Sequence, residues 1–169
     1  MKLSRQRGFT LIELAVVVSV VVILISTLLN RVWYYQEQAE KTAMEQVAGA
    51  LQEALTMEYG SLMTNHKETL VSELVLDNPM NWLQKIPGNY AGEYYDPTPR
   101  AVAPGNWVFD LKSRELIYVI NRSEHFMPGR DGNKWVRYHV RLVYSSLPGG
   151  GKKELSGVLF EPVEPYTWF

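Results

Sequence analysis

The stretch RGFTLIEL, residues 7–14, opens an apolar run that extends over residues 9–29 and contains a single charged residue, Glu13. Folded as an α-helix, a run of this length would be about 31 Å long, close to the thickness of the hydrocarbon core of a bilayer. Its many valines and isoleucines also suit a strand, but so long a continuous apolar run has no plausible strand interpretation. The run therefore predicts a membrane-spanning helix over residues 9–30.

Two features go beyond a plain membrane anchor. An ionisable residue such as Glu13 is costly inside a bilayer, and for that reason it is a functional candidate. A polar leader precedes the run and ends abruptly at Gly8. The leader carries three basic residues, Lys2, Arg5 and Arg7. A secretory signal peptide would place a small-residue cleavage pattern after the apolar run, whereas residues 28–31 read LLNR and do not fit that pattern.

The junction GFTLIEL, residues 8–14, resembles the processing site of type IV pilins and of the pseudopilins of type II secretion. In that family a short basic leader is removed after the glycine, the new N-terminal residue is N-methylated, and a glutamate stands four residues further on. The resemblance therefore implies that residues 1–8 form the prepilin leader and that cleavage falls between Gly8 and Phe9. It further implies that Phe9 is methylated and that Glu13 acts in assembly.

The function implied by the resemblance is that of a non-enzymatic structural subunit of a type IV pilus or a type II secretion pseudopilus. Its partners would be prepilin peptidase, other pilin or pseudopilin subunits, the inner-membrane assembly platform and the lipid bilayer, and no cofactor is implied. The sequence has no cysteine, whereas many main-fibre pilins carry a disulfide near the C-terminus. This difference favours a minor subunit.

The distribution of charge predicts the orientation in the membrane. Basic residues precede the apolar run, whereas Arg31 and Lys41 after it are offset by three glutamates between residues 37 and 45. The positive-inside rule then places the N-terminus in the cytoplasm and the C-terminal domain in the periplasm. Without the leader, 17 minus 3, or 14, lysines and arginines face 18 aspartates and glutamates. This weakly acidic balance gives no indication of a nucleic-acid partner.

Beyond the membrane the helix is expected to continue as an amphipathic half over residues 31–60, because residues 36–59 contain no proline and are rich in good helix formers. Apolar residues recur there at spacings of three and four, a pattern typical of a helix face that covers a core. Gly60 is expected to end or weaken the helix. The predicted stripe comprises Ala39, Ala43, Val47, Ala50, Leu51, Ala54 and Leu55.

The rest of the chain predicts a linking region, residues 61–106, followed by a sheet region, residues 107–169. In the linking region we expect short helices at 65–76 and 79–84, the second started by Asn78 and Pro79, and then a loop at 87–105. In the sheet region we expect a hairpin at 107–121 and strands at 135–144 and 155–163. The fold class is therefore α+β, a long N-terminal helix packed on an antiparallel sheet of about four strands, which is also the pilin architecture.

The strand at 135–144 alternates clearly, so its two faces can be assigned. The face expected to be buried carries Val136, Tyr138, Val140, Leu142 and Tyr144. The opposite face, expected to meet water, includes Arg137, His139 and Arg141, and it is either a solvated face or a contact surface for a neighbouring subunit or an acidic ligand. The aromatic C-terminus, residues 166–169, is expected to pack on the sheet, with an exposed docking element as the alternative.

No motif in the sequence predicts catalysis. His66, His125 and His139 lack ligand-like spacing and are expected to be structural or to lie at the surface. The DGN stretch at residues 131–133 is better explained by turn chemistry than by calcium binding. The opposing interpretation is a periplasmic enzyme or binding domain held by an uncleaved anchor, which would retain residues 1–8 and be indifferent to Glu13.

Overall fold

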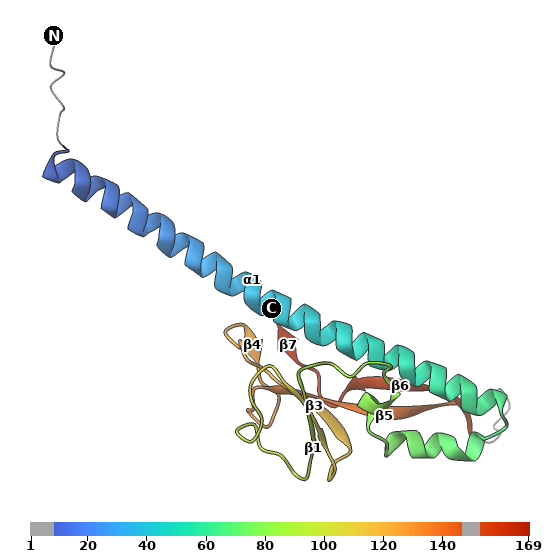
Figure 1. The fold of residues 1–169 in the computed structure, drawn as a ribbon. Helices are drawn as coiled ribbons and strands as arrows, with labels where there is room; N and C mark the ends of the chain where they lie inside the picture. Colours follow the sequence, from blue (N-terminus) through green and yellow to red (C-terminus); the bar gives the residue numbers. More distant parts are fainter. Residues whose placement is uncertain (1–8, 147–152) are drawn as a thin grey trace. The chain divides into compact units, whose positions relative to one another are not determined.

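The computed structural model describes residues 9–146 and 153–169, and its fold is α+β (Figure 1). Its contacts divide the chain into two compact units, Met1–Gln38 and Ala39–Phe169. Helix α1 (Leu11–Thr64) contributes its first half to the first unit and its second half to the second. The predicted leader, residues 1–8, lies outside the described residues.

The first half of α1 has the surface of a membrane-spanning helix. Every side chain from residue 9 to residue 29 is exposed, and within the described chain α1 is the one helix long and apolar enough to cross a bilayer. Its few hydroxyl groups bond to the helix itself. Ser19 Oγ donates to the Ala15 carbonyl and Ser26 Oγ to the Val22 carbonyl, both at 2.8 Å. These side chains therefore need no outside partner in an apolar environment.

The second half of α1 packs on the sheet through a face that differs in part from the predicted stripe. Leu51 and Leu55 are buried as expected, but Ala39, Ala43 and Ala50 are exposed. The first buried apolar residue of α1 is instead Met44, which the prediction left out. The predicted stripe differs from the buried face because it counted alanine as apolar by type. Alanine offers too little surface to determine which face of a helix is buried.

The long helix extends past Gly60 to Thr64, so the predicted end at Gly60 was wrong. The helix ends in a Schellman arrangement, in which the Lys67 amide donates to the Leu62 carbonyl at 2.9 Å and the His66 amide to the Met63 carbonyl at 3.3 Å. His66 has a φ of 58°, the left-handed conformation usually supplied by glycine. The sequence signal was missed because a histidine occupies this position.

The linking region contains more regular structure than predicted. The two expected helices are short 3₁₀ helices, η1 (Glu68–Val75) and η2 (Pro79–Trp82), and the Asn78 side chain caps the second by accepting from the Met80 amide at 3.0 Å. The predicted loop at 87–105 was wrong in part, because it contains strand β1 (Tyr90–Tyr94). Asn78 Nδ2 donates to the Tyr90 hydroxyl at 2.7 Å, which ties this strand to η2.

The main sheet has five strands in the order β1-β2-β3-β5-β6, one more than expected. The predicted hairpin is β2 (Trp107–Asp110) with β3 (Glu115–Val119), and the two later strands are β5 (Trp135–Ser146) and β6 (Lys153–Pro162). All neighbours pair antiparallel except β1 and β2, which are parallel. A second, small sheet joins β4 (Phe126–Met127) to β7 (Thr167–Trp168).

Aromatic side chains fill the core between α1 and the main sheet. The Trp107 ring lies 5.0 Å from the Tyr118 ring, and Tyr138 stacks on Phe160 at 5.1 Å. The face of β5 was predicted correctly for its first three residues, Val136, Tyr138 and Val140, which are buried. Tyr144 is 53% exposed, so the prediction was wrong there.

The opposite face of the sheet is not simply wet, as the sequence suggested. Val108, Ile117 and Val119 form a second buried cluster there with Val102, and Trp135 packs against it. Further along β5, Arg141 is exposed and bonds to Glu161 of β6. One end of this face is thus apolar and the other solvated.

Polar side chains of α1 bond to the backbone of the sheet region. The Glu40 carboxylate accepts from the amides of Asn121 at 2.7 Å and Arg122 at 2.9 Å. Gln52 Oε1 accepts from the Phe160 amide at 2.7 Å, on the edge strand β6. These contacts fix the position of the second half of α1 along the sheet, which apolar contacts alone specify less well.

We predict that Val140→Asp destabilises the domain by about 3–4 kcal/mol, because it places an unpaired charge in the core. Arg141→Gln is the matched control, one residue away on the solvated face, and should cost a small fraction of that amount. Thermal unfolding of the full chain in detergent, followed by near-ultraviolet circular dichroism, measures both. An equal fall in Tm for the two variants would show that the faces of β5 are assigned wrongly.

Candidate functional site

The start of α1 is set by Thr10. Phe9 and Thr10 lie outside the helix, Thr10 Oγ1 accepts from the Glu13 amide at 3.3 Å, and the Leu14 amide donates to the Thr10 carbonyl at 3.1 Å. Thr10 is therefore the N-cap residue. The pattern Thr-x-x-Glu at residues 10–13 is a known helix-start signal.

Glu13 occupies the third position of the helix, where a carboxylate faces the positive end of the helix dipole. Its side chain is exposed, and within residues 9–146 and 153–169 no hydrogen bond or ion pair reaches its carboxylate. Phe9, one turn earlier, is 71% exposed. The helix therefore presents one acidic group on an otherwise apolar surface, which in an apolar environment requires a partner.

Four of the predicted site residues fall within the leader and outside the described part of the chain. They are Lys2, Arg5, Arg7 and Gly8. Their roles, and the roles assigned to Phe9 and Glu13, remain predictions.

Comparison with protein families identifies this segment. Residues 3–29 match the family model described as the prokaryotic N-terminal methylation motif. The chain carries the signature of type IV pilins and pseudopilins. Together with the apolar half of α1, this prepilin-type motif indicates a membrane-anchored, pilin-like subunit that is proteolytically processed. No curated protein and no solved structure matches the chain.

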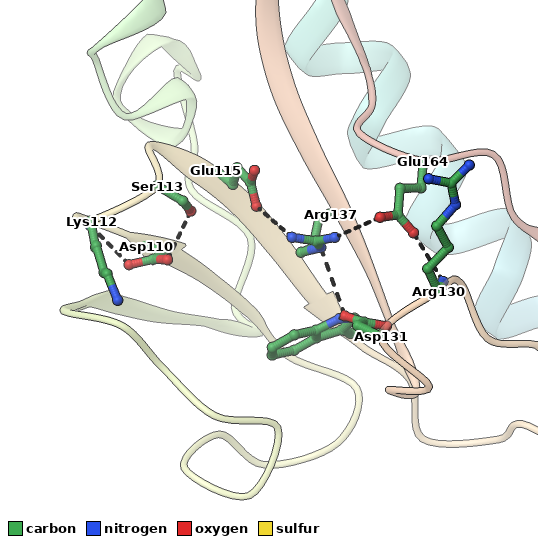
Figure 2. A network of polar contacts seen from close by, with 9 residues as sticks. Asp110, Lys112, Ser113, Glu115, Arg130, Asp131, Arg137 and Glu164 are labelled. Carbon is green, nitrogen blue, oxygen red and sulfur yellow. Dashed lines mark hydrogen bonds and ion pairs between the residues drawn. The ribbon is translucent and has the colours of Figure 1, made fainter.

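The sheet region contains a separate polar cluster centred on Arg137 of β5 (Figure 2). Its guanidinium group contacts three carboxylates, Glu115 on β3 at 3.5 Å, Glu164 after β6 at 3.2 Å, and Asp131 in the turn before β5 at 3.9 Å. The Arg137 side chain is 26% exposed and the Glu115 side chain 15%. Arg137 therefore belongs neither to a solvated face nor to a free contact surface, the two alternatives drawn from the sequence.

The Glu164 carboxylate lies close to the backbone of the turn that precedes β5. It accepts from the Arg130 amide at 3.1 Å, and a Cβ atom at Gly129 would lie 2.5 Å from its Oε2 atom. A side chain at position 129 would therefore make the Glu164 carboxylate shift from its present position beside Arg130 and Arg137.

The DGN stretch forms a turn, as predicted. The Asp131 carboxylate accepts from the Asn133 amide at 3.0 Å and from the Trp135 indole, and Gly132 has a φ of 68°. Burial raises the pKa of Asp131, but these hydrogen bonds and the Arg137 charge outweigh that effect and leave the pKa below its usual value. Asp131 therefore stabilises the turn in its charged form.

A second carboxylate, Asp110, organises the β2–β3 turn (Figure 2). It accepts from the Lys112 amide at 2.9 Å and from the Ser113 hydroxyl at 2.8 Å. Burial raises the pKa of Asp110. These two hydrogen bonds and a third from the Asp96 amide outweigh burial, so the pKa lies below its usual value. A hollow of about 420 Å³ lies beside the Asp110 and Arg137 clusters, but both clusters are already satisfied by their own partners.

The remaining candidates have local structural contacts. His66 ends α1, His125 stacks on Phe169 with ring centres 5.0 Å apart, and His139 lies opposite Glu161 on the neighbouring strand. The aromatic C-terminus packs on the domain through Trp168, which is 2% exposed and meets Phe126 edge-on at 5.6 Å. The packed alternative was thus correct for Trp168.

We predict that Arg137→Met destabilises the domain by about 1–3 kcal/mol at neutral pH, because three carboxylates lose their shared partner and repel one another. Arg141→Met is the matched control, since it breaks a solvent-exposed pair on the same strand and should change Tm much less.

The charge interpretation also predicts how the stability deficit of Arg137→Met changes with pH. The contribution of Asp131 to wild-type stability is present above its usual pKa of 3.8 and is lost as the pH falls through its lower folded value. In Arg137→Met that lowering is weaker, so the variant should lose less stability on acidification, and its Tm deficit should narrow between pH 7 and about pH 3. A deficit that widens on acidification would contradict the charge interpretation.

Proposed function

We propose that the chain is a non-enzymatic minor subunit of a type IV pilus or a type II secretion pseudopilus. It is stored in the inner membrane with its N-terminus in the cytoplasm and its domain in the periplasm. The observation that carries this proposal is the methylation motif at residues 3–29, joined to a helix whose first half exposes an apolar surface that Glu13 alone interrupts with a charge before residue 30. The prepilin peptidase, sibling subunits and the assembly platform are the partners.

Processing is proposed at the peptide between Gly8 and Phe9. Because Thr10 caps the helix, Phe9, on the C-terminal side of the scissile bond, lies before the first helical turn. A protease needs an accessible backbone, and the missing side chain of glycine permits close approach. Cleavage converts the Phe9 amide into a cationic amine, and N-methylation keeps that charge.

Assembly is proposed to match this new charge with Glu13. Within one chain the amine reaches the carboxylate only if the Thr10 cap and the first turn give way. A neighbouring subunit displaced along a fibre can present its own Phe9 amine to this Glu13 without such fraying. In a low-dielectric fibre core the attraction is strong but is offset by desolvation of both groups. The pair therefore serves mainly to fix the position of each subunit along the fibre, since a misplaced subunit leaves one charge without a partner.

We expect Gly8→Val to block removal of the leader, because a branched side chain obstructs the approach of the peptidase to the scissile bond. Intact-mass measurement on protein from a host that contains the peptidase reports the N-terminus directly. Ser4→Val is the control, a similar change away from the junction that should leave cleavage intact. A wild-type chain that keeps Met1 in this host would favour an uncleaved anchor and refute the proposal.

We expect Glu13→Val to be inserted and cleaved but to enter fibres poorly, because the mutant run is more apolar and lacks the partner for the Phe9 amine. The measurement is the fraction of the variant in sheared fibres relative to the membrane pool, with processing checked by mass. Ser19→Val is the matched control, since the Ser19 hydroxyl donates to the Ala15 carbonyl of its own helix and should be dispensable. Normal incorporation of Glu13→Val would remove the charge pair from the mechanism.

A further inference from the structure

Three successive aromatic residues, Trp33, Tyr34 and Tyr35, follow the apolar run on α1. Trp33 and Tyr35 are 49% and 60% exposed. The Tyr34 ring meets the Tyr35 ring edge-on at 5.8 Å, and its hydroxyl accepts a hydrogen bond from Gln38 at 3.1 Å. We call this trio the aromatic girdle.

The girdle covers more than half of the circumference of the helix, wider than a single packing face, although Tyr34 is half-buried. Successive residues of an α-helix are about 100° apart, so three in a row span about 200° around the axis. A helix that docks on a protein surface repeats its large apolar residues every three or four positions instead. Three consecutive rings suit an environment that is the same on all sides. The membrane–water interface is such an environment, and tryptophan and tyrosine are enriched there because a ring that is mostly apolar carries a polar group.

The spacing to Glu13 fits a bilayer. Trp33 follows Glu13 by 20 residues, which on a helix corresponds to about 30 Å, the thickness of the hydrocarbon core. Arg31 lies two residues before Trp33 and is exposed, and its long side chain can extend to the headgroups.

We propose that the aromatic girdle lies among the lipid headgroups on the side of the membrane away from the leader and sets the depth of α1. This inference rests on the proposed function, because it describes the membrane-stored form of the subunit. At that depth Glu13 lies at the opposite boundary of the hydrocarbon core, where its carboxylate keeps contact with water and headgroups. The cost of desolvating Glu13 then arises when the subunit leaves the bilayer, not while it is stored.

The test is depth-dependent quenching of tryptophan fluorescence. The full chain is reconstituted in vesicles of phosphatidylcholine and phosphatidylglycerol whose acyl chains carry bromine near the headgroup or near the far end. The other tryptophans belong to the Ala39–Phe169 unit, so the difference between wild type and Trp33→Phe isolates the signal of Trp33. We expect this difference signal to be quenched more by the shallow bromines than by the deep ones.

Ile23→Trp in the Trp33→Phe background is the matched depth control, since residue 23 lies midway between Glu13 and Trp33 and should be quenched more by the deep bromines. Stronger quenching of Trp33 by deep bromines, or none at all, would overturn the proposal, and so would a shallow signal from residue 23. Mass measurement identifies the N-terminus of each sample. The quenching pattern does not require cleavage and the mass reports cleavage directly, so a failure of processing and a failure of this inference give different results.

Discussion

The apolar side chains of residues 11–29 are exposed, and the described chain does not bury them within itself. Fully burying a valine, leucine or isoleucine side chain contributes about 1.5–3 kcal/mol, and the segment exposes more than a dozen of them. The total is on the order of 20 kcal/mol or more, which exceeds the net stability of about 5–15 kcal/mol of a typical domain. The segment must therefore lie in lipid or against other apolar helices.

The second half of α1 differs from the first, because polar side chains fix its position on its own domain. Glu40 and Gln52 bond to backbone groups of the sheet region, as a neighbouring strand would. Gln52 also covers part of the outer edge of β6, and an uncovered edge strand invites pairing with other chains. A segment whose apolar surface needs a partner outside the chain is thus continuous with one whose position on its own domain is fixed.

The sequence predicted the features that depend on local pattern, and the misses have physical causes. The apolar run, the β2–β3 hairpin, the buried first half of β5 and the Asn78 cap follow from periodicity and capping chemistry. Strand β1 was missed because its parallel pairing with β2 depends on a distant segment. The Arg137 cluster was missed for the same reason, since its carboxylates come from three separate places in the chain. Only the Thr10 cap left a local signal that went unused.

The buried position of Trp168 has a consequence for the order in which the domain can form. Trp168 pairs with β4 through β7, and its carbonyl accepts from Lys41 Nζ at 2.8 Å, so residues 127 positions apart in sequence close the same end of the core. In a chain that is synthesised or exported from its N-terminus, the domain cannot complete its fold until residue 168 emerges. Contacts of such large sequence separation slow folding, and the incomplete domain would meanwhile expose aromatic surface to which chaperones and proteases respond.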